Sequence, residues 1–209
     1  MSVSLTASAS RLGALAAVLL VGLFSLQACA DRGGGRSPRV YLDQATAVTV
    51  TTVGRPLVFA HERPNFAVHM RDYITLAAAS VDRAGKLESI LIAYYWTTFD
   101  PHGQDEQTGV RPHAGGFPDE LILMADDRRI QIMKLERSAH EAGIEERAHA
   151  PPVGGGMPAI YSVDLATMRY IAAARNLSAQ TRTGETVLDY EMWEDGRPAL
   201  AEWLHHLAE

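Results

Sequence analysis

One segment gathers side chains that could bind a metal ion. It reads DPHGQDEQTGVRPHAGGFP, residues 100–118, and it contains His102, Asp105, Glu106 and His113. Imidazole nitrogens and carboxylate oxygens suit zinc or a similar divalent ion when three or four of them converge within about 2.0–2.2 Å of it. Spacing alone does not establish convergence, and a solvated loop has the same composition. We therefore treat the segment first as a structural or disordered loop, with partner binding and a metal or catalytic site as alternatives.

The length of this segment is the reason to consider it at all. It joins two predicted strands, where a connection of about 2–5 residues would serve, and long loops of this kind are usually functional or disordered. Other motifs are weak. His61-Glu62 and His140-Glu141 each begin like a zinc-protease helix, but neither has a second histidine four residues after the first. The sequence contains no nucleophile elbow, phosphate-binding loop or dinucleotide fingerprint.

The only cysteine, Cys29, is the other residue with distinctive chemistry. It follows an uncharged apolar run at 12–24, which is short for a membrane span and suits the apolar core of a secretory signal peptide. Leu26-Gln27-Ala28-Cys29 resembles the lipobox of bacterial lipoproteins. That resemblance implies a lipid on the Cys29 sulfur and cleavage before it. Ala30 after the cysteine favours sorting to the outer membrane.

The chain is therefore expected to have three parts. Residues 1–28 are a signal peptide, and residues 29–38 are the lipidated cysteine and a glycine-rich tether that contains Gly33-Gly34-Gly35. Residues 39–209 form a single β-rich domain. Removal of the signal peptide takes away one arginine and no acid, which leaves 18 basic against 25 acidic residues and a net charge of −7. This balance argues against nucleic acid as a partner and against electrostatic docking on anionic lipid.

The strongest predicted strand is KLESILIAYYWTTF, residues 86–99. It follows a strand-like run at 66–81 and the turn signal Asp82-Arg83-Ala84-Gly85, so the two runs predict a long hairpin. We expect one face of the second strand to be core and the other to be mixed. The first face carries Ile90, Ile92, Tyr94 and Trp96, and the second carries Leu91, Tyr95 and Phe99. Tyr94 and Trp96 could instead line a ligand groove.

Alternation of apolar and polar residues predicts further strands, and 3.6-residue periodicity predicts two helices in the C-terminal half. Asp164 suits an N-cap, Asn176 a left-handed C-cap, and Pro198 an early position in the last helix. The fold class is α+β and mainly β. We expect an antiparallel β-sandwich or a strongly curved sheet of about eight or nine strands, with the two helices packed on it.

Two runs are similar to uncharacterised proteobacterial lipoproteins: residues 39–99, from RVYLD to AYYWTTF, and the ending YEMWEDGRPALAEWLHHL. The resemblance implies location and no activity. The leading hypothesis is a non-enzymatic accessory or interaction module, held to the outer membrane by its lipid, facing the periplasm and binding another envelope protein. The alternatives are a metal-dependent hydrolytic enzyme that uses the 100–118 loop, and a small-ligand or lipid carrier. No cofactor is expected apart from the covalent lipid and, in the enzyme alternative, a divalent metal.

The lipid anchor gives the first prediction. Cys29→Ala removes the only sulfur that can carry the diacylglyceryl group, and stable membrane attachment needs such chains. We expect the protein to move from the membrane fraction to the soluble fraction and to lack the added mass of the acyl chains. Gly34→Ala in the tether is the control and should stay in the membrane fraction. Unchanged fractionation and mass in Cys29→Ala would rule out the anchor.

Overall fold

The computed structural model describes residues 35–63, 70–98, 118, 120–144, 149 and 158–208. The chain divides into two compact units, Met1–Gly35 and Arg36–Glu209. The strands of the second unit are β1 (Arg39–Asp43), β2 (Val48–Thr52), β3 (Leu57–Arg63), β4 (Met70–Arg83), β5 (Lys86–Thr97), β6 (Glu120–Ala125), β7 (Arg128–Lys134), β8 (Ala159–Ser162), β9 (Leu177–Thr183) and β10 (Thr186–Glu194). Its helices are α2 (Leu165–Ala173) and α3 (Arg197–His206).

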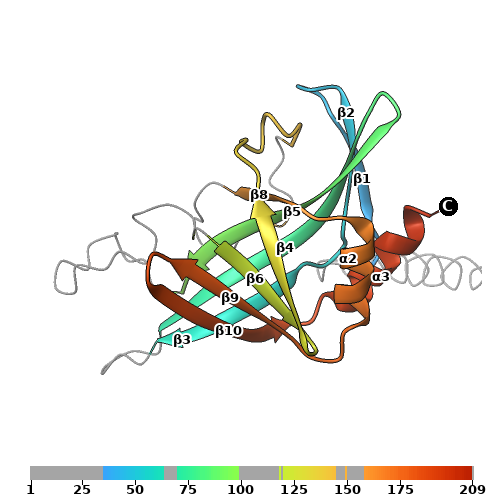
Figure 1. Ribbon diagram of the computed structural model, residues 1–209. Coiled ribbons are helices and arrows are strands. Elements are labelled where there is room, and N and C mark those ends of the chain that lie inside the picture. The colour runs from blue at the N-terminus through green and yellow to red at the C-terminus, as the bar shows by residue number, and fades with distance from the viewer. Residues whose placement is uncertain are drawn as a thin grey trace, which may run out of the picture. The chain divides into compact units, whose positions relative to one another are not determined.

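Eight strands close into an antiparallel barrel (Figure 1). The order around the ring is β4-β3-β10-β9-β6-β7-β8-β5, and β5 pairs with β4 to complete it. The remaining strands, β1 and β2, extend the sheet from the far half of β4. The prediction of a mainly antiparallel β fold with two helices is confirmed. The sandwich is wrong, because β5 pairs with both β4 and β8 and thereby joins the two ends of one sheet.

The β4–β5 hairpin is the longest ladder, with every residue from Asp72 to Arg83 paired with one between Thr97 and Lys86. Its two turn residues, Ala84 and Gly85, have φ angles of 54° and 83°. Positive φ at both positions is the geometry of a two-residue turn that matches the right-handed twist of the strands. The sequence predicted this hairpin correctly.

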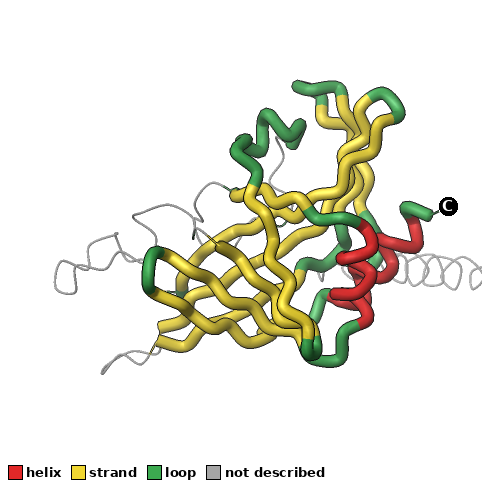
Figure 2. The backbone as a smooth tube through the Cα atoms, viewed as in Figure 1, coloured by secondary structure: helices red, strands yellow, loops and turns green. Residues whose placement is uncertain are grey.

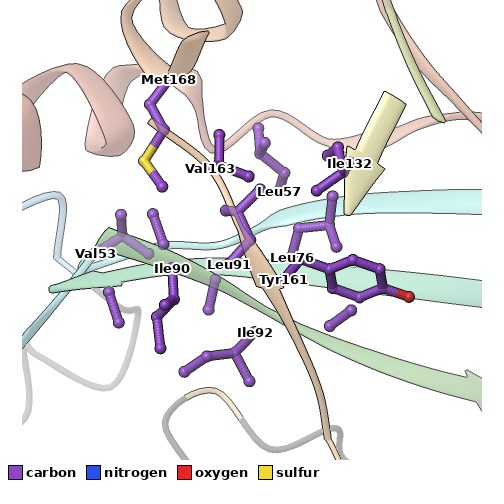
Figure 3. Close-up of a cluster of buried hydrophobic side chains, with 14 of the residues drawn as sticks. Val53, Leu57, Leu76, Ile90, Leu91, Ile92, Ile132, Tyr161, Val163 and Met168 are labelled. Carbon is purple, nitrogen blue, oxygen red and sulfur yellow. The ribbon is translucent and has the colours of Figure 1, made fainter. Parts of the chain in front are cut away.

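Register divides the barrel strands into an inward and an outward face. Inward-facing side chains from all eight strands form an apolar core. Figure 3 draws part of the buried cluster, in which inward residues such as Leu76 and Leu91 lie near Ile90 of the outward face and Met168 of α2. The largest fully buried members of the core are Phe59, Ile74, Leu76, Leu91, Leu121, Tyr161 and Tyr190. Side chains with so little exposure leave no water-sized space beside them, so this part of the interior is filled.

The expectation that the face of β5 with Ile90, Ile92 and Tyr94 is core is confirmed by their burial, and the face expected to be mixed is also buried. Leu91 and Tyr95, on the face expected to be mixed, point into the barrel with Ala78 and Ile74 opposite them. The face expected to be the core points outward. It is nevertheless buried, with Ile90 and Ile92 both 0% exposed. Periodicity showed that β5 has two apolar faces and could not show which one a closed sheet turns inward.

The two helices lie side by side at one end of the barrel (Figure 2). Asp164 caps α2 as predicted, since its Oδ1 accepts from the Thr167 amide at 2.8 Å. On α3, Trp203 is fully buried and donates from Nε1 to the carbonyl of Thr51 at 3.0 Å. The hydrogen bond from Trp203 connects α3 to β2.

The predicted C-cap at Asn176 is wrong. Helix α2 ends at Ala173, and Ala174 is already extended, with φ −61° and ψ 141°. Instead, the carboxylate of Asp126 accepts from the amides of both Arg175 and Asn176, at 3.0 and 2.9 Å. A side chain 50 residues away therefore satisfies the backbone groups that a left-handed cap would have satisfied locally.

Within the described residues, no helix is both long enough and apolar enough to cross a membrane.

The start of α3 gives a prediction about stability. A Cβ added to Gly196 would lie 2.3 Å from the Pro56 carbonyl oxygen and 2.9 Å from that of Arg55, both backbone atoms that cannot swing aside. Gly196→Ala should lower the free energy of unfolding by about 1–3 kcal/mol, as overpacking usually does. Gly35→Ala, where a Cβ meets nothing within 4 Å, is the matched control. Equal urea midpoints for the two variants would contradict this packing.

Candidate functional site: an aromatic patch above a buried polar network

Most of the residues predicted as sites cannot be compared with the structure. Cys29 and the proposed ligands His102, Asp105, Glu106 and His113 lie outside the described residues, so their roles stay predictions. Within the described ranges, no group of three or more His, Cys, Asp or Glu side chains could hold a metal ion.

Tyr94 and Trp96 can be placed, and both lie on the outward face of β5. Each is paired across the hairpin with an outward residue of β4, Thr75 and Tyr73 respectively. Tyr94 is 1% exposed. The sheet therefore closes with these two side chains outside the barrel rather than lining its interior.

Trp96 belongs to a cluster that we call the aromatic patch, made of Tyr73, Trp96 and Trp193 with Arg71 and Glu62 at its border. Tyr73 and Trp96 stack with ring centroids 4.1 Å apart and planes 9° from parallel. Trp193 meets Tyr73 edge-on at 5.9 Å. The three rings come from strands β4, β5 and β10. β4 pairs directly with β5, whereas β3 lies between β4 and β10.

Trp193 is the exposed member of the patch. Tyr73 is 4% exposed, whereas Trp193 is 52% exposed. Trp193 sits at an irregularity in the β10–β3 ladder, where the register shifts between Met192 and Glu194. Bulges of this kind redirect a side chain locally. The indole is thus held at the surface by the backbone, with Tyr73 behind it.

Charged groups border the exposed indole. The Arg71 guanidinium carbon lies 4.8 Å from the centroid of the Trp193 ring, a cation–π contact. Its Nη2 is 3.9 Å from Glu62 Oε1, and the two side chains are 35% and 57% exposed. The patch therefore offers one large apolar ring, one cation and one carboxylate to a molecule that approaches from solvent.

Beneath the patch, the inward faces of β3 and β4 carry a partly buried ion pair. Arg63 of β3 donates from Nε to Oδ2 of Asp72 of β4, and their side chains are 25% and 1% exposed. The other oxygen of Asp72 has no hydrogen-bond partner within the described part of the chain. A buried carboxylate with one oxygen unsatisfied is costly, so it depends strongly on its single partner.

Three buried tyrosines belong to the same inward face of the sheet. Tyr190 lies close to the ion pair, and Tyr95 and Tyr161 contact one another. Burial, followed by the negative charge of Asp72, raises the pKa of Tyr190 to about 12. Burial also raises the pKa of Tyr95 and of Tyr161, whose hydroxyls lie 3.2 Å apart. All three phenols stay protonated at neutral pH. They serve as neutral hydrogen-bonding groups and do not supply an activated base or nucleophile.

His61 completes the network on β3. Its Nδ1 lies 2.7 Å from the carbonyl oxygen of Asp189, and a carbonyl can only accept, so Nδ1 carries the proton. The ring also lies 5.5 Å from that of Tyr190. The imidazole thereby joins β3 to β10 at the edge of the network. The polar contacts of Arg63, Tyr95 and His61 each join two strands of the barrel.

Comparisons of the chain with protein-family models, with curated proteins and with solved structures found no significant match. The chemistry of the surface itself is therefore the guide to function.

Sequence reasoning missed Tyr73, Arg71 and Trp193 as a group. Part of the signal was present, because Tyr73 and Trp96 have opposite positions in the predicted hairpin and must share a face. The other part was absent. Trp193 reaches them only through the pairing of β10 with β3, and nothing in the local pattern of either segment specifies that partner.

The buried pair gives a prediction by comparison of single and double variants. Arg63→Met leaves the Asp72 carboxylate buried and uncompensated, so unfolding free energy should fall by about 3–5 kcal/mol. Addition of Asp72→Val removes the stranded charge and should restore most of that loss, because apolar replacement of a whole buried pair is often close to neutral. Urea unfolding measures both. A double variant no more stable than Arg63→Met would show that the lost pairing is not the cause.

Proposed function

We propose that the protein is a lipid-anchored, non-enzymatic interaction module of the bacterial cell envelope, and that it contacts a partner protein through the aromatic patch. The anchor follows from the resemblance to a lipobox at Leu26-Gln27-Ala28-Cys29. The observation that carries the contact is Trp193, a large indole exposed at a strand irregularity and braced by Tyr73 and Arg71.

The composition of the patch favours a protein as the partner. Tryptophan, tyrosine and arginine are the residues most enriched among those that dominate binding energy at protein interfaces. A braced indole also has little freedom to lose on binding, which lowers the entropic cost of the contact. Arg71 and Glu62 add one charge of each sign at its border, which suits a polar rim around a central aromatic contact.

The filled interior of the barrel favours surface binding over carriage of a lipid-sized molecule. Inward-facing side chains such as Phe59, Leu121 and Tyr161 are at most 1% exposed. Eight-stranded barrels either fill their interior with side chains or hold one small ligand. The part of the interior lined by these side chains matches the first case.

The test is site-specific photo-crosslinking in cells, with the anchored full-length protein. A photoreactive amino acid at Glu191, exposed on β10 near the patch, should give a discrete crosslinked product. The same amino acid at Met133, which is 65% exposed on β7, is the control and should not. Equal crosslinking at the two positions would contradict a partner bound at the patch.

The captured partner then allows a binding measurement. Trp193→Ala should weaken binding about 30-fold or more, which corresponds to the roughly 2 kcal/mol of an interface residue that dominates affinity. Met133→Ala removes an equally exposed apolar side chain elsewhere and should leave affinity unchanged. Thermal unfolding of both variants should match the unmodified protein, because both side chains are largely exposed. An unchanged affinity in Trp193→Ala would remove the patch from the interface.

A further inference from the structure

The second exposed apolar surface lies on the sheet extension, by which we mean β1, β2 and the paired halves of β4 and β5 at 79–83 and 86–89. Register aligns Leu42 with Thr49, Thr49 with Asp82, and Asp82 with Leu87. Directly opposed residues share a face of the sheet. Leu42 and Leu87 therefore stand at the two ends of one row, on the same face.

Val40 belongs to that face as well, since it lies two residues from Leu42 on β1. The three side chains are 57% (Val40), 62% (Leu42) and 48% (Leu87) exposed. The other large apolar residues that are exposed in the described part of the chain, Met133, Val187 and Trp193, lie on the outer face of the barrel. The extension thus has a separate apolar face of its own.

Basic side chains border this face but do not lie on it, because Arg39 and Lys86 alternate with Val40 and Leu87 along their strands. Arg36, Arg39 and Lys86 are exposed, and none of them makes an ion pair with another described residue. The acidic groups nearby are engaged within the fold. Asp43 accepts from the amides of Ala45 and Thr46, Asp82 accepts from that of Gly85, and Glu88 pairs with Arg137.

The chain reaches this surface soon after its proposed lipid. The nine residues 30–38 separate Cys29 from β1, so the start of β1 lies within roughly 35 Å of the Cys29 backbone even when the tether is fully extended. A tethered apolar surface meets the bilayer at a high effective concentration, and weak contacts then suffice.

We propose that the extension rests on the membrane through Val40, Leu42 and Leu87, which enter the interfacial region of the bilayer. This inference rests on the proposed anchor. In this proposal the apolar face of the extension contacts the lipid surface and not another protein. The aromatic patch borders the opposite end of β4, where Tyr73 is ten residues from Arg83, about 33 Å along a strand. The docked extension would hold that patch away from the bilayer.

The test uses the full-length lipidated protein in vesicles of phosphatidylethanolamine and phosphatidylglycerol. Cys29 is the only native cysteine, and its sulfur is blocked by the lipid, so a cysteine introduced at Thr49 takes a fluorescent dye alone. Thr49 is exposed in the middle of the row between Leu42 and Leu87. Gln131, exposed on the outward face of β7, supplies the control position. Doxyl-labelled phospholipid quenches dyes at the bilayer interface.

We expect at least threefold stronger quenching at Thr49→Cys than at Gln131→Cys. Leu42→Gln with Leu87→Gln should reduce it to the control level. The matched pair Met133→Gln with Val187→Gln should not. Equal quenching at the two dye positions would overturn the proposal. A second outcome would also overturn it: the protein is dimeric, and the dye at position 49 is shielded from water but is not quenched by lipid. A second copy of the chain would then cover the face. A protein without the lipid anchor would be recognised separately. Its free Cys29 would take a second dye, and the protein would not associate with vesicles.

Discussion

The β4–β5 ladder is the constraint on which the rest of the structure depends. Twelve consecutive pairs, from Asp72↔Thr97 to Arg83↔Lys86, hold the two strands in one register. Side chains alternate strictly across a strand, so this register decides which residues face into the barrel and which face out. It places Asp72 in the buried network and its neighbours Arg71 and Tyr73 in the aromatic patch. A shift by one residue would bring Arg71 and Tyr73 inward and expel the Asp72 carboxylate, so the two sites depend on one pairing.

The opposite edge of β4 is shared by two strands, and this sharing divides the unit into a barrel and an extension. β3 pairs with the first half of β4 and β2 with the second, on either side of the turn at Gly54-Arg55-Pro56. Closure removes the free edges of a sheet, whereas strands left outside a ring keep theirs. β1 is short, and among the described strands only β2 pairs with it. The exposed Val40 and Leu42 are thus a consequence of a strand that the barrel does not include.

Local features of this fold were predictable, and its closure was not. The turn at Ala84-Gly85 and the cap at Asp164 depend on neighbouring residues, and both were predicted correctly. β1 was missed, because Arg39 and Asp43 leave little of an apolar pattern. The barrel depends on pairings such as β10 with β3, where His61 meets Asp189 across 128 residues. No residue in either strand specifies the other as its neighbour. For the same reason the aromatic patch was not foreseen.

The position of each feature along β4 gives the two surfaces different physical roles. Near Tyr73, the strand has a buried charge pair inside and stacked rings outside, so neither face can rearrange without loss of contacts on the other. Such a surface is rigid, which favours specific recognition by complementary shape. Near Arg83, the extension carries three exposed aliphatic side chains and no stacked rings among its described residues. Non-directional apolar burial is sufficient for a bilayer, which offers no fixed shape to match. One continuous ladder therefore separates a rigid surface suited to a protein from an adaptable surface suited to lipid.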